Sequence, residues 1–384
     1  MTDVRFGIIG IGGMGRHHAQ YLYGGEIPGA KLAAVADAVP AARDWAQTRF
    51  EGNVQVFESP SELLESGAVD AVIIATPHYL HPPLAIAALK SGIHALVEKP
   101  AGVYTKQVKE MNEVAEQSGK VFGIMFNQRT HGAHQKLHEL VRGGELGEIK
   151  RTHYVITDWF RSQAYYDSGG WRATWQGEGG GVLLNQSPHN LDLWQWICGM
   201  PTRVRAYCGF GKYHNIEVED DVTAFVEYAN GATGTFITAT GEAPGTNSLE
   251  IVGDRGKLLW TEGKLTFWQT RVPVSEWTRT AKSGFEQPET WKIEIPTKGG
   301  EDHKGITKNF VAAIRDGVPL LARGQEGIHG VTLANAMLLS SWTDSWVDLP
   351  LDDELYYQKL QERIANSTFT KDAEGKSLEF TGTF

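Results

Sequence analysis

Cysteine is scarce in this chain, which has Cys198 and Cys208 among its 384 residues. The two cysteines form no CxxC pair, so they supply neither a dithiol redox motif nor the disulfide framework of a small secreted domain. We expect both thiols to be free and buried in a protein of a reducing compartment. Contact between them across neighbouring elements is the alternative.

Long apolar runs and an excess of positive charge are also missing. No apolar stretch is long enough to span a bilayer, and a first strand that begins by Val4 leaves no room for a signal peptide. The formal net charge of −10 disfavours binding to nucleic acid or to an anionic membrane. We therefore expect a cytoplasmic protein whose partner is a small molecule.

The most informative segment is the glycine loop, Gly10-Ile11-Gly12-Gly13-Met14-Gly15. Gly10 permits a tight turn, Gly12 lets the backbone approach a pyrophosphate, and Gly15 lets the following helix pack on the preceding strand. An apolar strand pattern precedes the loop and a helix pattern follows it, as a dinucleotide site requires. We predict that the whole loop binds a dinucleotide; a glycine-rich turn in another α/β domain is the alternative.

An acidic residue after the second predicted strand indicates which dinucleotide is bound. Asp37 follows the glycines at the distance where a carboxylate accepts hydrogen bonds from the adenosine ribose hydroxyls. A carboxylate repels the additional phosphate of NADP, and Ala38-Val39-Pro40 offers no arginine to bind it. The sequence therefore favours NAD, although Arg43 could swing in.

The chain is long enough for two domains. Residues 1–126 alternate strand and helix patterns, which predicts an α/β domain with a doubly wound parallel Rossmann sheet. Its expected strands end at Ala36, Phe57, Ala75, Val97 and Phe126.

From residue 127 to 350 the pattern changes to long strands, and we predict an α+β domain with a large, open, mostly antiparallel sheet. The expected strands are 148–158, 203–210, 222–228, 233–240, 248–252 and 257–260, and the expected helices are 134–141, 306–316 and 327–346. Helices on one face leave the other uncovered, so we expect a homodimer or homotetramer that forms through this sheet. A monomer with a solvated sheet face is the alternative. Residues 351–384 form a tail with one predicted helix.

Two clusters carry the predicted chemistry. Lys99, in Glu98-Lys99-Pro100, ends a parallel strand at the edge where doubly wound sheets bind ligands. The second cluster follows Gly179-Gly180-Gly181, where Asn185, His189 and Asp192 share one helix face. Trp171-Arg172 just upstream could face a sugar ring. Trp159, Arg161, Tyr165 and Tyr166 could add an aromatic wall or pack in the core.

These motifs together resemble the Gfo/Idh/MocA family of oxidoreductases, over nearly the whole chain to about residue 350. The matching features are the glycine loop, Asp37, Ala75-Thr76-Pro77-His78, Glu98-Lys99-Pro100, Trp171-Arg172, and the run from Gly179 to Asp192. The resemblance implies hydride transfer at a secondary alcohol of a sugar or cyclitol.

The resemblance also implies roles for individual residues. Lys99 would hydrogen-bond the reacting oxygen and His189 would shuttle its proton, while Arg172 would lie near the nicotinamide. The implied cofactor-lining residues are Thr76, Pro77, His78, His81, Glu98, Lys99 and Asn127. Many members have aspartate where this chain has Asn185, which cannot take a proton. We therefore expect Asn185 to orient a substrate hydroxyl and His189 to be the general base. The expected substrate contacts are Lys99, Arg129, Trp171, Arg172, Asn185 and His189.

Three functions are compatible with these residues. The first is an NAD-dependent dehydrogenase of a cyclitol such as an inositol, or of a pyranose. The second is a glycosidase that uses transient oxidation by tightly held NAD, and the third is a non-catalytic sugar sensor. Lys99 and His189 argue against a sensor, which needs neither. A metal site from His78, His81 and His189 is conceivable, but no HExxH motif accompanies it, so we expect no metal.

Overall fold

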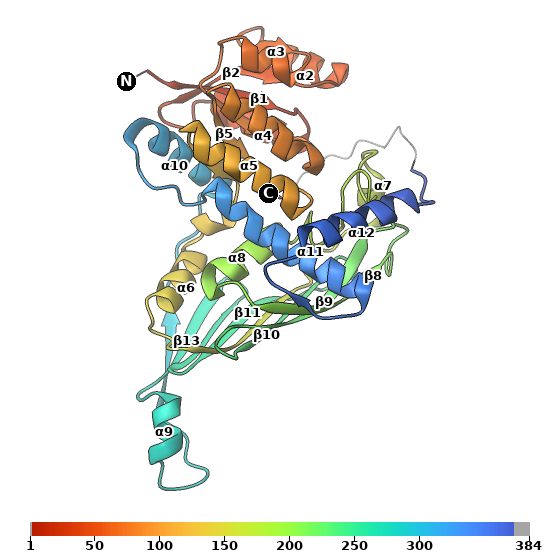
Figure 1. The fold of residues 1–384 in the computed structure, drawn as a ribbon. Coiled ribbons are helices and arrows are strands. Elements are labelled where there is room, and N and C mark those ends of the chain that lie inside the picture. Colours follow the sequence, from red (N-terminus) through yellow and green to blue (C-terminus); the bar gives the residue numbers. More distant parts are fainter. Residues whose placement is uncertain (1, 372–384) are drawn as a thin grey trace.

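Two β-sheets organise the chain in the computed structural model, which describes residues 2–371 (Figure 1). Within these residues the first sheet has six parallel strands in the order β3-β2-β1-β4-β5-β6. Its strands are β1 (Val4–Ile9), β2 (Ala30–Ala36), β3 (Gln55–Phe57), β4 (Ala71–Ile74), β5 (His94–Val97) and β6 (Phe122–Ile124). This order and the parallel pairing confirm the predicted Rossmann sheet.

Local sequence signals explain the helices of this domain. The Ser59 side chain accepts from the Glu62 backbone N–H, and the Glu62 side chain accepts from the Ser59 backbone, a capping box that starts α3. Pro40, Pro60 and Pro82 lie in first turns, where the missing N–H costs nothing. The helices are α1 (Gly13–Tyr23), α2 (Pro40–Phe50), α3 (Pro60–Glu65), α4 (His81–Lys90) and α5 (Thr105–Ser118), with the 3-10 turn η1 (His78–Leu80) before α4.

The second sheet has nine strands among the described residues, in the order β14-β13-β12-β11-β7-β10-β9-β8-β15. All neighbours pair antiparallel except β7 and β10, which are parallel. Its strands are β7 (Ile149–Ile156), β8 (Arg203–Phe210), β9 (Glu219–Glu227), β10 (Thr233–Ala239), β11 (Asn247–Gly253), β12 (Gly256–Thr261), β13 (Lys264–Thr270), β14 (Thr290–Ile295) and β15 (Val347–Asp348). The predicted open, mostly antiparallel sheet is confirmed.

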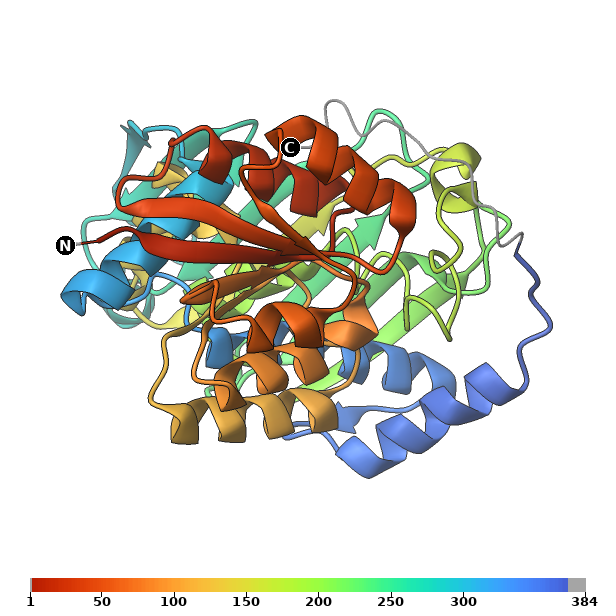
Figure 2. The ribbon, with the colours of Figure 1, turned by 90° about the horizontal axis from the view of Figure 1, so that it is seen from above.

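Among the helices of the second half, α8 (Pro188–Cys198) and α11 (Gly327–Thr343) lie between the two sheets (Figures 1 and 2). α11 contacts β8 below it, α8 beside it and α5 of the N-terminal domain. The elements are η2 (Asn127–Thr130), α6 (Gly132–Arg142), α7 (Gln163–Asp167), α8 (Pro188–Cys198), α9 (Val274–Thr280), α10 (Asp302–Asp316), η3 (Gly324–Glu326), α11 (Gly327–Thr343) and α12 (Asp353–Ala365). α11 is apolar and largely buried because it serves both cores.

The structure corrects several predicted boundaries. β13, α9 and β14 were not predicted; β13 and β14 are strands of the sheet, whereas α9 between them projects beyond it (Figure 1) and has no buried residue. α10 begins at Asp302 rather than Ile306. α11 ends at Thr343 rather than Trp346, because Asp344 adopts a left-handed conformation with φ 48° and stops the helix.

Packing crosses the predicted domain boundary at residue 126. Ile306, Phe310 and Val311 of α10 belong to the core of the parallel sheet, and the Ile124 backbone N–H donates to the Ala322 carbonyl. The N-terminal unit therefore includes α10, which returns to it from the far end of the second sheet. The tail contains the predicted single helix, α12, and the part of it after residue 371 lies outside the described residues.

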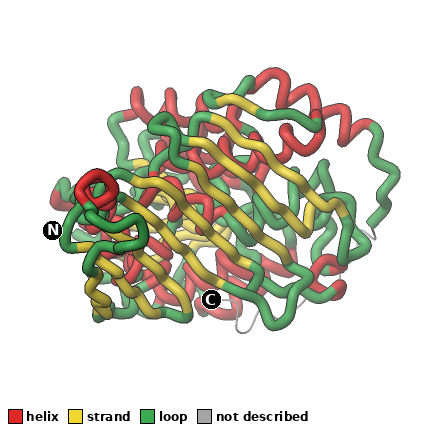
Figure 3. Tube along the Cα trace, turned by 90° about the horizontal axis from the view of Figure 1, so that it is seen from below, coloured by secondary structure: helices red, strands yellow, loops and turns green. Residues whose placement is uncertain are grey.

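The large sheet has one face without helices across most of it (Figure 3). Tyr207 is 72 % exposed and Phe225 38 % exposed, and strand pairing places both on one face. Ile237 and Val155 continue this stripe across β10 and β7. An apolar stripe on an uncovered sheet face is typical of a protein–protein contact, so a homo-oligomer remains our prediction.

This prediction can be tested by placing a charge in the stripe. Ile237→Glu should convert an oligomeric protein to monomer, because an unpaired carboxylate would be buried in the contact. Size-exclusion chromatography with light scattering would measure the mass, with Lys359→Glu on α12 as control. A monomeric unmodified protein would contradict the prediction.

Candidate active site

The glycine loop has the shape that a dinucleotide needs. Gly10 has φ +92°, and a Cβ there would lie 2.7 Å from the Ala75 carbonyl oxygen; a Cβ on Gly15 would lie 1.8 Å from the Gly10 carbonyl oxygen. Packing therefore requires both glycines. A Cβ on Gly12 would meet none of the described atoms within 4 Å, so the loop is open there, where a pyrophosphate would approach the start of α1.

Asp37 lies beside this loop at the end of β2. Its carboxylate accepts from the backbone N–H of Ile11 at 2.6 Å and of Val39 at 2.8 Å. Arg43 donates to the carbonyls of Asp37 and Ala38, both at 2.9 Å. The carboxylate is thus fixed next to the loop, and Arg43 is held by backbone carbonyls. This arrangement suits NAD.

Two turns follow the adjacent strands β4 and β5, and His81 joins them. Its Nδ1 lies 2.7 Å from the Pro100 carbonyl oxygen and its Nε2 2.7 Å from the Thr76 carbonyl oxygen. Both ring nitrogens are therefore committed to backbone, and we assign His81 to holding the turns together rather than to cofactor contact. The Thr76 hydroxyl is buried with no hydrogen-bond partner among the described residues, and Pro77 precedes η1.

Lys99 reaches from this edge to the second domain. Its Nζ donates to the Asn185 carbonyl oxygen at 2.9 Å. Burial lowers the pKa of Lys99; the Glu98 carboxylate opposes this shift, and Arg172 and Arg161 add to it. Glu98 itself is buried: its Oε2 accepts from the Lys99 backbone N–H, and its Oε1 lies 2.7 Å from His18 Nε2.

His189 lies in the first turn of α8, close enough to Lys99 for their charges to interact. Burial holds the pKa of His189 well below 6.5, and the positive charge of Lys99 lowers it further. His189 is 8 % exposed, and its Nδ1 has no hydrogen-bond partner among the described residues. The imidazole is therefore neutral at neutral pH and can accept a proton.

An aromatic and polar wall faces this pair from the segment 165–172. The Arg172 guanidinium lies over the rings of Tyr165 and Trp171, 4.6 and 4.7 Å from their centroids, and its Nη1 donates to Tyr165 Oη at 2.7 Å. The edge of His78 meets the Trp171 ring at 5.1 Å between centroids. His78 therefore contacts the 165–172 wall.

Asn127 and Arg129 lie on η2, at the junction of the domains. Asn127 Nδ2 is 3.4 Å from His303 Nδ1 on α10. Arg129 is 1 % exposed and donates to both carboxylate oxygens of Asp192, at 2.8 and 2.6 Å, as well as to Glu326 and the Leu321 carbonyl. The structure thus corrects the expectation for Arg129. It joins η2 to α8 and η3 in an interior ion pair, so we no longer count it among substrate contacts.

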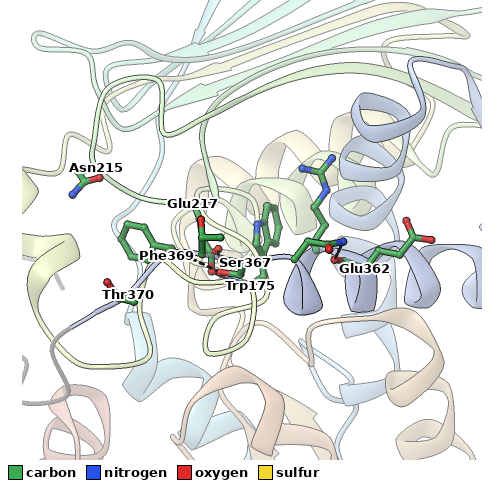
Figure 4. Close-up of a pocket in the computed structure, with 10 residues that line it drawn as sticks. Trp175, Asn215, Glu217, Glu362, Ser367, Phe369 and Thr370 are labelled. Carbon is green, nitrogen blue, oxygen red and sulfur yellow. Dashed lines mark hydrogen bonds between the residues drawn. The ribbon is translucent and has the colours of Figure 1, made fainter.

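The C-terminal segment closes over the 165–172 wall from outside. Lys371 Nζ donates to the backbone carbonyls of Tyr166, Ser168 and Arg172. Ser367 points towards Glu217 and donates to it (Figure 4). The cavity of about 710 Å³ drawn there is lined by Trp175, Asn215, Glu217, Glu362, Arg363 and residues 366–370. It contains none of the predicted site residues.

Sequence analysis missed three residues of the site region. Glu178 and Gln186 hydrogen-bond Asn185 and Tyr165 respectively, and Lys371 lies in the tail. A charged residue directly before a glycine run, in a segment otherwise poor in charge, was the available signal for Glu178. Lys371 had no such signal, because its contacts lie about two hundred positions away in sequence.

Comparison with known proteins agrees with this geometry. Residues 4–126 match the oxidoreductase family model described as an NAD-binding Rossmann fold, and residues 134–259 match the GFO/IDH/MocA C-terminal domain. The chain belongs to the Gfo/Idh/MocA family. It is an NAD-binding oxidoreductase of the sugar and polyol class.

Individual relatives are distant but cover most of the chain. Levoglucosan dehydrogenase of Pseudarthrobacter phenanthrenivorans is 25% identical over 91% of this chain and 99% of its own length. The scyllo-inositol 2-dehydrogenase (NAD(+)) of Bacillus subtilis is 27% identical over 67% of this chain and 73% of its own. The WlbA dehydrogenase of Chromobacterium violaceum, solved with NADH and UDP-GlcNAcA, is 28% identical with a TM-score of 0.78, covering 92% and 97%.

Residues 2–371 contain no group of three histidine, cysteine, aspartate or glutamate side chains placed to hold a metal ion. In the same range, every helix is too short or too polar to cross a membrane.

The interior ion pair gives a stability prediction. Arg129→Met should lower the free energy of unfolding by about 3–5 kcal/mol, because Asp192 would remain buried without its charge partner. Lys359→Met, which removes the exposed pair with Glu362, should cost less than about 1 kcal/mol. Urea unfolding of both variants measures the difference, and equal effects would contradict an interior role for Arg129.

Proposed function

We propose that this protein oxidises a secondary hydroxyl of a cyclitol or pyranose, with NAD as the hydride acceptor. The observation that carries the proposal is the hydrogen bond from Lys99 Nζ to the Asn185 carbonyl, which joins the carboxyl edge of the Rossmann sheet to the turn that leads into His189. Lys99 lies in the turn after β5 and His189 in the first turn of α8, so the two come from different domains. NAD supplies the hydride chemistry when it is bound.

The roles follow from the charge states of the two side chains. Alcohol oxidation releases a proton from the hydroxyl, and a neutral buried imidazole can take it, so His189 is the proposed general base. The Lys99 ammonium would stabilise the negative charge that develops on the oxygen. Asn185, which receives the Lys99 hydrogen bond through its carbonyl, would orient the hydroxyl with its side chain.

The cations near the site favour an uncharged polyol. Arg129 is held in an interior ion pair, and Arg172 is held between two aromatic rings. Arg161 lies over Trp159 and Tyr165. A substrate with a diphosphate would be bound better by several unpaired cations, so we favour a neutral cyclitol or sugar over a nucleotide sugar.

Nicotinamide absorbance with NAD, and separately with NADP, would test the proposal across inositol isomers, common pyranoses and several nucleotide sugars. We expect reduction of NAD with a neutral polyol. Lys99→Met should lower kcat by on the order of 10²-fold or more, because the developing charge loses its partner. NAD affinity, measured by calorimetry, should change little. Full activity of Lys99→Met would refute its role. No turnover, with NAD bound to the purified protein, would favour the glycosidase or sensor alternative.

The pKa shifts also predict a pH profile. His189 must be neutral to act as base, so kcat/KM should rise with pH through a pKa well below 6.5 and be level at neutral pH. Lys99 must be charged, so kcat/KM should fall again as the pH rises through the pKa of Lys99, which lies below the ordinary lysine value of 10.5. His189→Gln should remove the acidic limb from whatever activity is left. An acidic limb at or above pH 6.5 in the unmodified enzyme would contradict the assignment.

A further inference from the structure

Glu178 is a buried carboxylate to which the proposed mechanism assigns no role. It is 1 % exposed and lies directly before the glycine run 179–181. Its Oε2 accepts from the Ala173 backbone N–H at 2.6 Å, and its Oε1 accepts from the side-chain Nδ2 of Asn185. Burial raises the pKa of Glu178, while the Arg172 charge and the two accepted hydrogen bonds oppose this shift. Both oxygens receive donors, which is the pattern of an ionised carboxylate.

This contact determines which way the Asn185 amide faces. An ionised carboxylate only accepts hydrogen bonds, so it selects the NH₂ end of the amide. The Asn185 Oδ1 then faces Tyr165, whose hydroxyl donates to it at 3.3 Å. Tyr165 in turn accepts from Arg172 at 2.7 Å and from Gln186 at 3.0 Å, so its own proton is left for Asn185. The directions of these hydrogen bonds agree with this orientation.

We propose that Glu178 is a positioning residue that holds Asn185 with its amide oxygen towards Tyr165 of the 165–172 wall. Position 185 then presents an acceptor oxygen, as an aspartate there would, without placing a second negative charge in the site. The effect of Glu178 on catalysis rests on the proposed dehydrogenase function, whereas its hydrogen bond with Asn185 does not.

Exchanging the carboxylate of position 178 and the amide of position 185 should preserve a hydrogen bond between the two positions. In Glu178→Gln, the new amide oxygen accepts from Ala173, so its NH₂ faces Asn185 and turns the Asn185 amide around. In Asn185→Asp, two carboxylates meet and one must hold a proton. In the double variant, the amide now at position 178 donates to the carboxylate now at position 185, and the second oxygen of that carboxylate faces Tyr165. Acceptor oxygens again face Ala173 and Tyr165, and the hydrogen bond between positions 178 and 185 forms with its direction reversed.

The experiment is a double-variant cycle on kcat/KM, with a polyol that the nicotinamide-absorbance panel shows to be oxidised. We expect Glu178→Gln and Asn185→Asp each to lose on the order of 10²-fold, and the double variant to return to within about threefold of the unmodified enzyme. The relative activity of Asn185→Asp should improve as pH falls, because protonation relieves the carboxylate contact. NAD affinity should stay unchanged throughout.

Glu217 offers a matched control. It accepts from the Trp175 backbone N–H at 2.7 Å, in the same turn that Glu178 supports, but it does not contact Asn185. Glu217→Gln should therefore not rescue Asn185→Asp. Losses in the Glu178→Gln/Asn185→Asp double variant that equal the product of the single losses would overturn the proposal, as would rescue by Glu217→Gln.

Thermal unfolding of the same variants separates this inference from the proposed function. If no polyol is oxidised, the function fails, but the pair can still be tested by coupling in stability. The Glu178→Gln/Asn185→Asp double variant should then be more stable than the sum of the single effects predicts. Additive effects on stability would refute the hydrogen-bond exchange even if the enzyme is active.

Discussion

The hydrogen bond from Lys99 Nζ to the Asn185 carbonyl is the contact on which the site depends. Lys99 is fixed by the end of β5 in the parallel sheet, and Asn185 by the turn that leads into α8 of the second domain. Neither domain contains the site alone, because the proposed base and the group that would stabilise the alkoxide come from different cores. The relative placement of the domains therefore determines the catalytic geometry.

Buried polar contacts maintain that placement. Arg129 joins η2 to α8 through Asp192, and the Asn335 side chain on α11 accepts from the Thr105 N–H and donates to the Val103 carbonyl. Apolar packing of α11 against both domains stabilises their contact, but it constrains their relative orientation little because the hydrophobic effect is non-directional. Hydrogen bonds with defined donors and acceptors fix the orientation, since a buried donor left without its acceptor is costly.

The sequence predicted those features that depend on local pattern. Buried runs such as Val4–Ile9, the glycine turn and strand alternation each reflect a period or a turn requirement of a few residues. The position of Lys99 followed from the general rule on parallel sheet edges. The same reasoning failed for Arg129, because an arginine that binds substrate and one that binds Asp192, 63 positions later, look identical in sequence. Glu178 was missed for the same reason: its role depends on which side chains the fold brings to it.

The charges around Lys99 explain why one site can hold an ammonium and a neutral imidazole side by side. The carboxylates of Glu98 and Glu178 both favour the charged form of Lys99, while burial and the Lys99 charge favour the neutral form of His189. Removing either carboxylate would lower the pKa of Lys99. Removing the Lys99 charge would raise the pKa of His189. The acid–base assignment is therefore a property of the whole cluster, because each charge state depends on its neighbours. An amide at position 185 is compatible with these charge states. A carboxylate there would lie beside Glu178, and each of the two carboxylates would raise the pKa of the other.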